Sequence, residues 1–270
     1  MIRAAVLGSP INHSLSPLLH NTAYRRLGIA ADYQAIELTP ERAFDFFDEI
    51  SKSDWRGFSL TMPLKETIIS LGEKLEFSID PSAKRALSGN TVVRQGDNFH
   101  VTSTDRTAFQ RLLKGYPGVR VAIIGGGGTA RAALSALEGS DCEVDFLLRT
   151  PGRANVLQSI ADGLNLKFFS MDHALDGYEI VISTVPSGVS DEIARGLTRR
   201  IPFFFEVLYN PYPTKLLARC RDLGSQTLDG IDLLVEQALD QIALFSGVEF
   251  SFNQMREELQ RAARSTFSRS

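Results

Sequence analysis

The sequence alternates short apolar or β-branched runs with longer amphipathic runs along almost its whole length. In the first half, the strand-like runs and the helix-like runs that follow them are 3–8 with 17–28, 32–38 with 40–50, and 57–61 with 65–75. In the second half the pairs are 119–125 with 129–139, 142–148 with 151–164, 179–184 with 191–197, and 203–208 with 213–224. This alternation is typical of βαβ units and predicts an α/β fold with mainly parallel sheets.

The length of the chain and one turn predict two domains. The chain has 270 residues, whereas a single domain typically has about 150. The helix-like run AFQRLLKG ends in the turn YPGV before the second series of strands begins. Two further helical runs, at 233–247 and 256–265, could pack back on the first domain. We therefore predict one domain over residues 1–105 with 240–270 and a second over residues 106–239.

Charge and composition exclude several classes of protein. With 29 basic and 32 acidic residues the formal net charge is −3, which indicates neither a nucleic acid nor an anionic membrane as partner. Cys142 and Cys220 lack the spacing of a disulfide framework or a zinc site, so we predict reduced core thiols and no metal. No signal peptide or membrane-spanning run is visible. We expect a cytoplasmic protein, a monomer or a homodimer, that binds a small molecule.

Four consecutive glycines follow the strand-like run VAII and precede a helical run. Gly125, Gly127 and Ala130 match the G-x-G-x-x-A spacing of a dinucleotide-binding turn, in the strand–turn–helix context that it requires. Glycines let the backbone approach a pyrophosphate, and the N-terminus of the following helix presents N–H groups to it. The predicted contacts are Gly125, Gly126, Gly127, Gly128, Thr129 and Ala130. The alternative is a flexible turn between two elements.

The end of the next strand-like run distinguishes NADP from NAD. An NAD site usually places an acidic residue there for the ribose 2′-hydroxyl. Here the run CEVDFLL leads into Arg149, Thr150 and Arg153, two cations and a hydroxyl that suit a 2′-phosphate. Asp145 lies at about the right distance in sequence for the acidic residue, but it falls inside the strand. These residues favour NADP, and solvated surface cations are the alternative for the arginines.

Nine motifs give the sequence a specific resemblance. In chain order they are GSPINHSLSPLLHN, GFSLTMPLKE, GNT, STD, GGGGTARAA, LRT, STVPSG, YNPYPTKLL and DGIDLLVEQA. Each motif alone is weak, but all nine in the same order are not a chance match. The chain resembles shikimate dehydrogenases over nearly its whole length. The resemblance implies a substrate-binding domain, a Rossmann-type NADP-binding domain, and reduction of 3-dehydroshikimate to shikimate in aromatic amino-acid biosynthesis.

The resemblance also implies which residues form the substrate site. Ser14 and Ser16 would hold the substrate carboxylate, a role that short hydroxyls beside a helix N-terminus can fill. Ser16 before Pro17 also has the pattern of a helix N-cap, so both roles stay open. The residues implied at the ring are Thr61, Lys65, Asn90, Asp105, Tyr209 and Gln237. Those implied at the cofactor further include Thr184 and Gly230.

Lys65 lies in the stretch LTMPLKET, where a strand-like run ends and a helical run begins. A lone lysine in such a place is most often a solvated surface cation. Oxidation of a secondary alcohol by hydride transfer, however, needs a group that takes the hydroxyl proton. Beside Asp105, Lys65 can act as a proton relay or as a fixed cation that polarises the oxygen. The sequence leaves both roles open.

Two other functions stay open. One is a family member that acts on quinate or on an aminated analogue with NAD, and the other is a nucleotide-binding paralogue without activity. The presence of Lys65 and Asp105 argues against an inactive paralogue. The sequence departs from the usual family motifs at residues 87–89, Ser103, Leu148 and residues 183–186. These departures bear on cofactor affinity and on the exact ring substrate more than on the type of reaction.

Overall fold

The computed structural model describes residues 1–50, 53–161 and 163–267. It divides into two compact units, one formed by Met1–Ala108 with Leu234–Ser270 and the other by Phe109–Leu233. The division falls inside helix α5 (Thr104–Leu112) and inside helix α10 (Gly230–Ser246). Strands alternate with helices in both units, which confirms the predicted α/β class.

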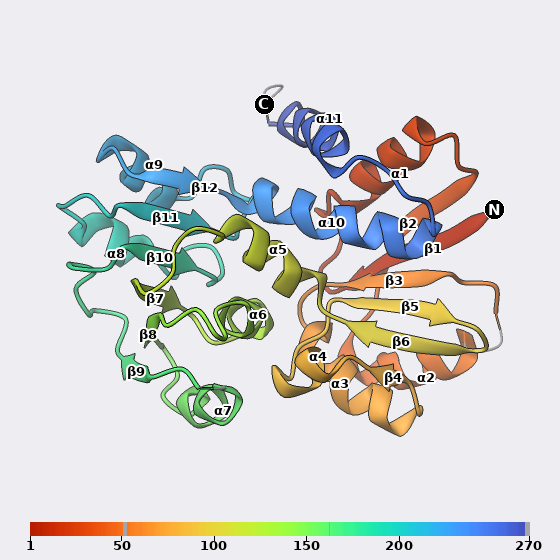
Figure 1. Ribbon diagram of the computed structural model, residues 1–270, viewed down its shortest axis with the longest axis horizontal. Helices are drawn as coiled ribbons and strands as arrows, with labels where there is room; N and C mark the ends of the chain where they lie inside the picture. The colour runs from red at the N-terminus through yellow and green to blue at the C-terminus, as the bar shows by residue number, and fades with distance from the viewer. Residues whose placement is uncertain (51–52, 162, 268–270) are drawn as a thin grey trace. The chain divides into compact units, whose positions relative to one another are not determined.

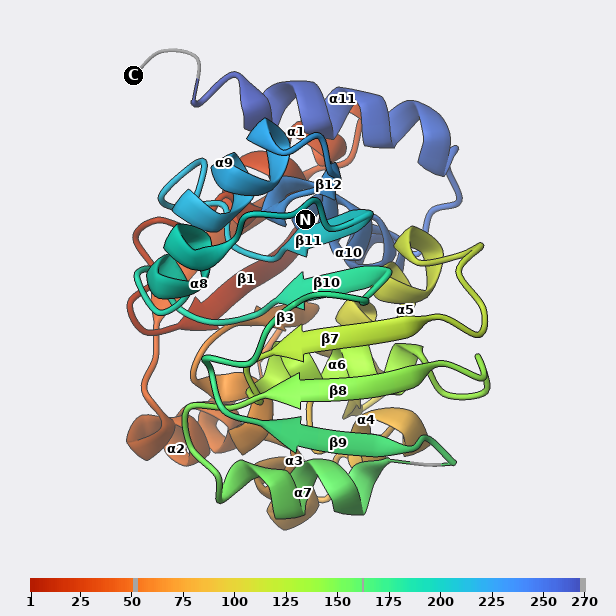
Figure 2. The same ribbon diagram turned by 90° about the vertical axis from the view of Figure 1, so that its left-hand side faces the viewer.

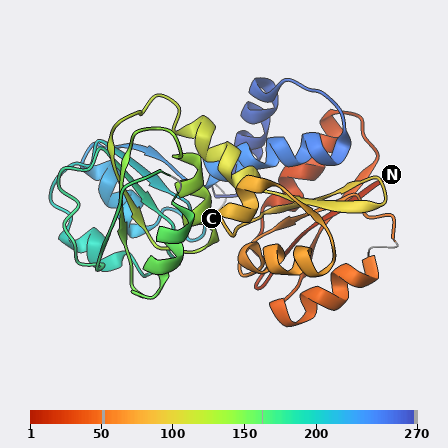
Figure 3. The ribbon, with the colours of Figure 1, turned by 60° about the horizontal axis from the view of Figure 1, so that its bottom comes forward.

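The first unit is built on a six-stranded sheet with the strand order β2-β1-β3-β5-β6-β4. Helices α1 and α10 cover one face of this sheet and α2 and α3 the other (Figures 1 and 3). Besides α5 and α10, its elements are β1 (Ile2–Gly8), α1 (Ser16–Arg26), β2 (Ala31–Glu37), α2 (Pro40–Ile50), β3 (Gly57–Leu60), α3 (Leu64–Lys74), β4 (Ser78–Ile79), α4 (Pro81–Arg85), β5 (Thr91–Gln95), β6 (Asn98–Thr102) and α11 (Phe252–Arg264).

One strand of the first sheet, β5, runs against its neighbours. It pairs antiparallel with β3 and with β6, whereas β1 pairs parallel with both β2 and β3. The β5–β6 hairpin is absent from the predicted elements. Its two-residue loop is Gly96-Asp97, and Gly96 has a φ of +61°, which glycine adopts without strain. A Gly-Asp pair between two strand-like runs is a hairpin signal.

The second unit contains a six-stranded, fully parallel sheet with the order β12-β11-β10-β7-β8-β9 (Figure 2). Numbered from its first strand, β7, this is the 3-2-1-4-5-6 order of the Rossmann fold. Its elements are β7 (Arg120–Ile124), α6 (Gly128–Ala136), β8 (Glu143–Leu147), α7 (Arg153–Ile160), β9 (Leu166–Phe169), β10 (Ile180–Ser183), α8 (Asp191–Gly196), β11 (Phe203–Glu206), α9 (Lys215–Asp222) and β12 (Gln226–Leu228).

Most predicted elements are observed with shifted ends. The helix predicted over 151–164 is observed as α7, which ends at Ile160, and residue 162 lies outside the described residues. The two C-terminal helical runs correspond to α10 and α11, and α11 packs against α1 in the first unit. The C-terminal segment therefore returns to the first unit.

Cys142 and Cys220 are both buried and free, as predicted. Within residues 1–50, 53–161 and 163–267, none of the helices has the length and apolar character that a membrane crossing requires. The same ranges contain no group of three or more His, Cys, Asp or Glu side chains that could hold a metal ion.

Candidate functional site

Strand direction brings most of the predicted substrate residues to one edge of the first sheet. Strands β1 and β3 are parallel, and β5 runs antiparallel to both β3 and β6. The carboxyl ends of β1, β3 and β6 and the amino end of β5 therefore lie at the same edge (Figure 1). The predicted residues that adjoin these strand ends are Ser14 and Ser16 after β1, Thr61 and Lys65 after β3, Asn90 before β5, and Asp105 after β6.

Lys65 and Asp105 form an ion pair at this edge. Lys65 Nζ lies 2.6 Å from Asp105 Oδ2, and the two side chains are only 16% and 5% exposed. Asp105 lies in the first turn of α5, where the helix dipole stabilises a carboxylate. The Ser103 hydroxyl caps this helix by accepting from the Arg106 N–H at 3.4 Å. The capped start of α5 and the ion pair with Lys65 therefore fix the position of the Asp105 carboxylate.

Lys65 lies in the first turn of α3, where the helix dipole disfavours a cation by about 0.3–1 kcal/mol. Its main-chain carbonyl accepts from the Gly89 N–H at 2.9 Å, which ties the start of α3 to the segment that carries Asn90. A solvated surface cation does not describe a lysine that is mostly buried and paired with Asp105. The helix dipole disfavours a cation at this position, and the ion pair with Asp105 offsets that cost at the edge of the sheet.

Asn90 and Gln237 are buried and hydrogen-bond each other. Asn90 Nδ2 donates to Gln237 Oε1 at 3.2 Å and to Thr104 Oγ1 at 3.0 Å. The Thr104 N–H donates to Asn90 Oδ1 at 2.7 Å, which fixes the orientation of the amide. Gln237 Nε2 donates to the Leu234 carbonyl at 3.0 Å within α10. A ring hydroxyl that binds Asn90 would replace one of these internal hydrogen bonds.

Ser16 is not the N-cap of α1, contrary to one of the two roles left open for it. The helix begins at Ser16 itself, its N-cap is Leu15, and no side chain caps it at that position. The Ser14 hydroxyl accepts from the Ser16 N–H at 3.3 Å, so Ser14 supplies a partner for the start of the helix. Ser16 is buried.

Thr61 is held at the same edge by the first strand. Its N–H donates to the Leu7 carbonyl at 2.9 Å, which continues the pairing of β3 with β1 by one residue. A methyl group added at Gly8 would lie 2.4 Å from Thr61 Cγ2. Glycine at the end of β1 therefore allows the two strand ends to approach, and the methyl of Thr61 fills the space.

In the second unit, the glycine-rich turn lies where the strand order reverses. Gly125 follows β7, Thr184 follows β10, and these two strands are neighbours. Gly125 has a φ of +106°, and a methyl group added to it would lie 2.6 Å from Thr184 Oγ1. Thr184 Oγ1 in turn donates to the Ile124 carbonyl at 2.8 Å. Open α/β sheets bind their ligands at this switch point, outside the carboxyl ends of the strands.

The turn has the features that a pyrophosphate requires. Gly127 is the N-cap of α6 and makes no side-chain cap hydrogen bond, and α6 begins with Gly128 and Thr129. A methyl group at Gly126 would lie 3.1 Å from Leu148 Cδ2, so a larger residue would crowd the side chains packed beneath the turn. Ala130, the third position of the motif, is fully buried. The residues present therefore fit a dinucleotide whose pyrophosphate lies at this helix N-terminus.

Arg149, Thr150 and Arg153 are exposed and follow β8, the neighbour of β7. Arg153 Nη1 donates to the carbonyl of Gly126 at 2.9 Å, which keeps this arginine beside the glycine-rich turn. Arg153 is therefore not a solvated cation without local contacts.

Asp145 is excluded as the ribose ligand by its own contacts. It is buried inside β8, where Tyr178 donates to its Oδ2 at 2.7 Å and Arg120 Nη2 lies 3.2 Å from the same oxygen. The strand continues to Leu147, so Asp145 does not lie at its carboxyl end. The groups that follow the carboxyl end of β8, where NADP and NAD sites differ, are therefore the cations and hydroxyl of Arg149, Thr150 and Arg153.

Tyr209 belongs to the second unit, whereas the other predicted substrate residues belong to the first. It lies in the loop after β11, and buried Glu206 closes this loop by accepting from the Leu208 N–H at 3.3 Å and from Thr214 Oγ1 at 2.8 Å. Burial raises the pKa of Glu206 to about 7. A methyl group at Gly230 would lie 2.5 Å from the carbonyl carbon of Leu208, so Gly230 allows α10 to begin against this loop.

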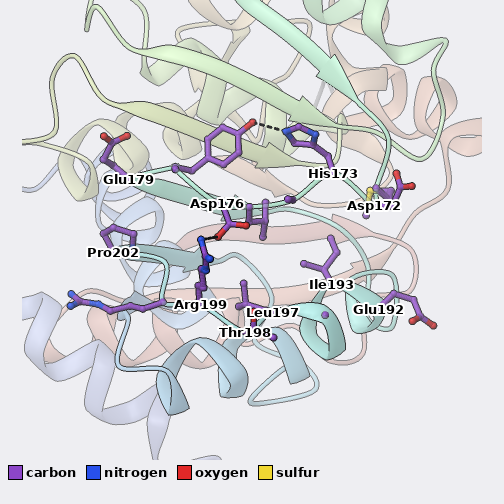
Figure 4. A pocket seen from close by; sticks show the side chains of 17 residues that line it. Asp172, His173, Asp176, Glu179, Glu192, Ile193, Leu197, Thr198, Arg199 and Pro202 are labelled. Carbon is purple, nitrogen blue, oxygen red and sulfur yellow. Dashed lines mark hydrogen bonds and ion pairs between the residues drawn. The ribbon is translucent and has the colours of Figure 1, made fainter.

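The second unit also contains a cavity of about 670 Å³ (Figure 4), and none of the predicted site residues is among those that line it. Its lining includes Glu179 and Pro202, which directly precede β10 and β11, and Tyr178, whose hydroxyl is 3.3 Å from His173 Nε2. The cavity thus adjoins the amino ends of these strands, whereas dinucleotides bind at the carboxyl ends. It is not the predicted cofactor site.

The chain is similar over most of its length to curated shikimate dehydrogenases. The shikimate dehydrogenase (NADP(+)) of Exiguobacterium sp. strain AT1b is 32% identical over 251 residues, which cover 91% of this chain and 93% of that relative. The chain belongs to the shikimate dehydrogenase family. Residues 6–92 also match the family described as the shikimate dehydrogenase substrate binding domain.

Solved structures of shikimate dehydrogenases have the same fold. That of Mycobacterium tuberculosis has a TM-score of 0.86 at 28% identity and covers 97% of this chain and 100% of its own. That of Thermus thermophilus, in complex with NADP(H) and shikimate, has a TM-score of 0.82 at 28% identity and also covers 97% of this chain and 100% of its own. The two-domain dehydrogenase fold predicted from the motifs is therefore confirmed.

Three buried residues of the first unit were not predicted from the sequence. Thr91 and Thr104 hydrogen-bond Asn90, and Gln241 hydrogen-bonds Thr91. Thr104 lies inside the STD motif, and Gln241 lies four residues after Gln237, hence on the same side of α10. Spacing along the helix was the available signal for Gln241.

Proposed function

We propose that this protein is an NADP-dependent shikimate dehydrogenase that reversibly reduces 3-dehydroshikimate to shikimate, in the pathway that leads through chorismate to the aromatic amino acids. The observation that carries the proposal is the Lys65–Asp105 ion pair, 2.6 Å long, at the edge of the sheet where the other polar candidates gather. The proposal keeps the predicted domain roles, with substrate binding in residues 1–105 and 240–270 and NADP binding in residues 106–239.

In this proposal each end of the substrate has its own partners. Ser14 and Ser16 hold the carboxylate, because their hydroxyls lie at the start of α1, where the helix dipole favours a negative charge. The ring hydroxyls bind side chains that offer both donors and acceptors, since each hydroxyl needs its own partner. These side chains are Thr61, Asn90 and Gln237 from the first unit and Tyr209 from the second.

The reaction needs one proton and one hydride. When bound, NADP accepts the hydride from the alcohol, or as NADPH returns it to the ketone. Lys65 donates a hydrogen bond to the reacting oxygen, where negative charge develops, and Asp105 holds the ammonium group in position. Lys65 either exchanges the proton itself or stabilises the charge while water carries the proton, and both roles require the same geometry.

Arg149, Thr150 and Arg153 select NADP in this proposal, because an arginine forms strong charge-assisted hydrogen bonds with a phosphate. The glycine-rich turn, Thr184 and Gly230 shape the rest of the cofactor site. The proposal places the enzyme in the cytoplasm, where the free thiols of Cys142 and Cys220 stay reduced. It involves a small-molecule substrate and neither nucleic acid nor membrane, with the protein as a monomer or homodimer.

Steady-state rates with shikimate and quinate, each with NADP and NAD, test the proposal directly. We expect shikimate with NADP to give the highest kcat/KM. Arg149→Ala should raise the KM for NADP about tenfold or more and change that for NAD little, because a charge-assisted hydrogen bond contributes about 1.5–3 kcal/mol. Arg200→Ala, an exposed arginine near the amino edge of the same sheet, is the matched control. Preference for quinate, equal use of NAD, or binding of NADP without turnover would each reject the proposal.

A further inference from the structure

The loop between β11 and α9, residues 207–214, is held by side chains rather than by regular structure. Its sequence, VLYNPYPT, contains Pro211 and Pro213, which lack the N–H groups that a helix or a strand would use. A connection of this kind usually lies on the surface and is more mobile than the elements it joins. The loop also carries Tyr209, the predicted substrate residue that belongs to the second unit, so its conformation determines where this residue lies.

Glu206, the last residue of β11, binds both ends of this loop with one carboxylate and is 0% exposed. Its Oε1 accepts from the Leu208 N–H at 3.3 Å, and its Oε2 accepts from Thr214 Oγ1 at 2.8 Å. Thr214 Oγ1 also accepts from the Leu217 N–H at 3.1 Å as the N-cap of α9, so its single proton is donated to Glu206. The two ends of the loop therefore meet at the two oxygens of a buried carboxylate.

A second buried carboxylate, that of Asp229, holds the middle of the loop and is 1% exposed. Tyr212 donates its hydroxyl proton to Asp229 Oδ2 at 3.0 Å, and Arg221 Nη2 lies 3.1 Å from the same oxygen. Asp229 Oδ1 accepts from the Ile231 N–H at 3.1 Å, in the first turn of α10. The aspartate therefore connects the loop to α9 through Arg221 and to the start of α10.

Tyr209 lies between these two anchors. The residue before it, Leu208, is bound by Glu206 and also packs against the start of α10, because a methyl group added to Gly230 would lie 2.5 Å from the Leu208 carbonyl carbon. The chain is fixed again at Tyr212, three residues after Tyr209. Burial of a carboxylate costs free energy, and proteins accept such costs mainly at functional sites. Two buried carboxylates on either side of Tyr209 therefore point to a role for this residue's position.

We propose that Glu206 and Asp229 are positioning residues for Tyr209, which hold the backbone that carries it in one conformation before the substrate binds. This inference rests on the proposed function, which assigns Tyr209 to a ring hydroxyl. A residue that is held in place in advance loses little conformational freedom on binding, so its hydrogen bond contributes more to affinity. Loosening either anchor should therefore weaken the binding of shikimate through Tyr209.

Glu206→Gln and Tyr212→Phe loosen the two anchors separately. An amide has only one acceptor oxygen, so in Glu206→Gln either Leu208 or Thr214 loses its acceptor, whereas Tyr212→Phe removes one hydroxyl and keeps the ring. If Glu206→Gln fails to fold, Tyr212→Phe remains as the test. The assays are made at pH 8, because burial raises the pKa of Glu206 to about 7 and its carboxylate is ionised above that value.

Tyr178→Phe is the matched control, because Tyr178 forms the same kind of cluster elsewhere in the second unit. Its hydroxyl donates to buried Asp145 at 2.7 Å, Arg120 Nη2 lies 3.2 Å from the same oxygen, and the guanidinium lies over the tyrosine ring. Arg221 likewise lies over the ring of Tyr212. Both variants therefore remove a tyrosine–aspartate hydrogen bond, but Tyr178 precedes β10 at the amino edge of the sheet, whereas the loop follows the carboxyl end of β11.

We expect Glu206→Gln and Tyr212→Phe each to raise the KM for shikimate about fivefold, the effect of losing about one hydrogen bond. We expect kcat to change less than about threefold, because a group that positions the substrate acts mainly on binding. The KM for NADP should stay unchanged, and Tyr178→Phe should change neither KM. A lower melting temperature with a normal KM for shikimate, or an equal rise in the KM for NADP, would show that the carboxylates only stabilise the second unit and would overturn the inference.

A double-mutant cycle with Tyr209 tests whether the effect passes through this residue. Tyr209→Phe alone should raise the KM for shikimate about tenfold, and the addition of Glu206→Gln or Tyr212→Phe should raise it little further. Factors that multiply, or a normal KM in Tyr209→Phe, would overturn the inference even with normal turnover of shikimate. Absence of shikimate turnover in the parent would instead reject the proposed function, so the two failures are distinguishable.

Discussion

The two units place their candidate groups at one edge of a sheet, but the first unit uses side chains and the second uses mainly backbone. In the first unit, the candidate groups are side chains: Lys65 pairs with Asp105, and buried Asn90 hydrogen-bonds Thr104. In the second unit, glycines such as Gly125 let the backbone pack closely against Thr184, and the proposed cofactor site is built on this backbone. A side-chain site fails when a group is removed, whereas a backbone site fails when a group is added.

This difference predicts which kind of substitution should impair ligand binding in each unit. Removal of one member of a buried hydrogen-bonded pair leaves its partner unsatisfied, which costs about 1–3 kcal/mol. Addition of a methyl group to a glycine with positive φ costs a similar amount through backbone strain and also closes the space beside it. Substitutions in the two units should therefore affect different ligands.

The largest expected effect comes from removing the cation of the first unit. Lys65→Ala should lower turnover by about 10²–10⁴, the contribution of a group that transfers or holds a proton. Binding of shikimate should change much less. Single-turnover hydride transfer at saturating substrate, followed by NADPH absorbance, is the measurement. Lys74→Ala is the control, since Lys74 is an exposed lysine at the other end of α3.

A Lys65→Ala enzyme that keeps more than about a tenth of the normal rate would remove the lysine from the chemistry. Asp105→Ala should also lower turnover, because the ammonium group loses the carboxylate that holds it. If the two residues act as a unit, the double variant should be less impaired than the product of the two single losses. A fully multiplicative loss would show that they act separately.

The second effect is expected from a single added methyl group. Gly125→Ala should lower the affinity for NADP about 10- to 100-fold, since φ is +106° and the new carbon would lie 2.6 Å from Thr184 Oγ1. Gly139→Ala is the matched control, because Gly139 has a φ of +74° with open space around it. NADPH fluorescence titrations and thermal melts measure the two costs. Equal NADP affinity in the two variants would contradict a backbone-built site.

The sequence predicted the second unit more completely than the first, for a physical reason. Four glycines between a strand and a helix report a local backbone geometry, which one short segment determines. The antiparallel strand β5 was missed because the predicted elements were strand–helix pairs, and a hairpin does not follow that pattern. Its signal, the Gly96-Asp97 loop, was present in the sequence.

The network of the first unit could be predicted only in part. Family motifs pointed to Lys65 and Asp105, but Gln241 contacts Thr91 across 150 positions of sequence, and no local pattern reports such a contact. The proposed cap at Ser16 was wrong because α1 begins one residue earlier than the Ser-Pro pattern predicts, which moves the local hydrogen bond to Ser14. Tertiary packing determines both the Gln241–Thr91 contact and the start of α1, and the local sequence does not report it.

Glu206 sharpens the comparison, since its buried side chain holds the loop after β11 in the unit whose proposed cofactor site is built on backbone. Burial raises its pKa from 4.5 to about 7. Between these values the folded protein keeps the proton that the unfolded chain releases, so its contribution to stability is lost as the pH rises toward 7. We expect this loss to be on the order of 2 kcal/mol between pH 5 and pH 8.

Urea unfolding of the parent and of Glu206→Gln at pH 5, 6, 7 and 8 measures this contribution. The variant cannot titrate at this position, so its free energy of unfolding should fall less than that of the parent over the same range. Other ionisable groups are the same in both proteins and cancel in the difference. Parallel curves would show that the Glu206 carboxyl has an ordinary pKa.

The smallest effect is expected from Ser14→Ala. Ser14 is half-buried, and its hydroxyl already accepts from the Ser16 N–H at 3.3 Å. Its loss should cost about 1 kcal/mol, which raises the KM for shikimate about fivefold and leaves that for NADP unchanged, since NADP is assigned to the other unit. Ser9→Ala is the control, because Ser9 lies in the same connection and donates to Glu37 at 2.9 Å. If Ser14→Ala lowers only the melting temperature, Ser14 supports the helix and does not bind the carboxylate.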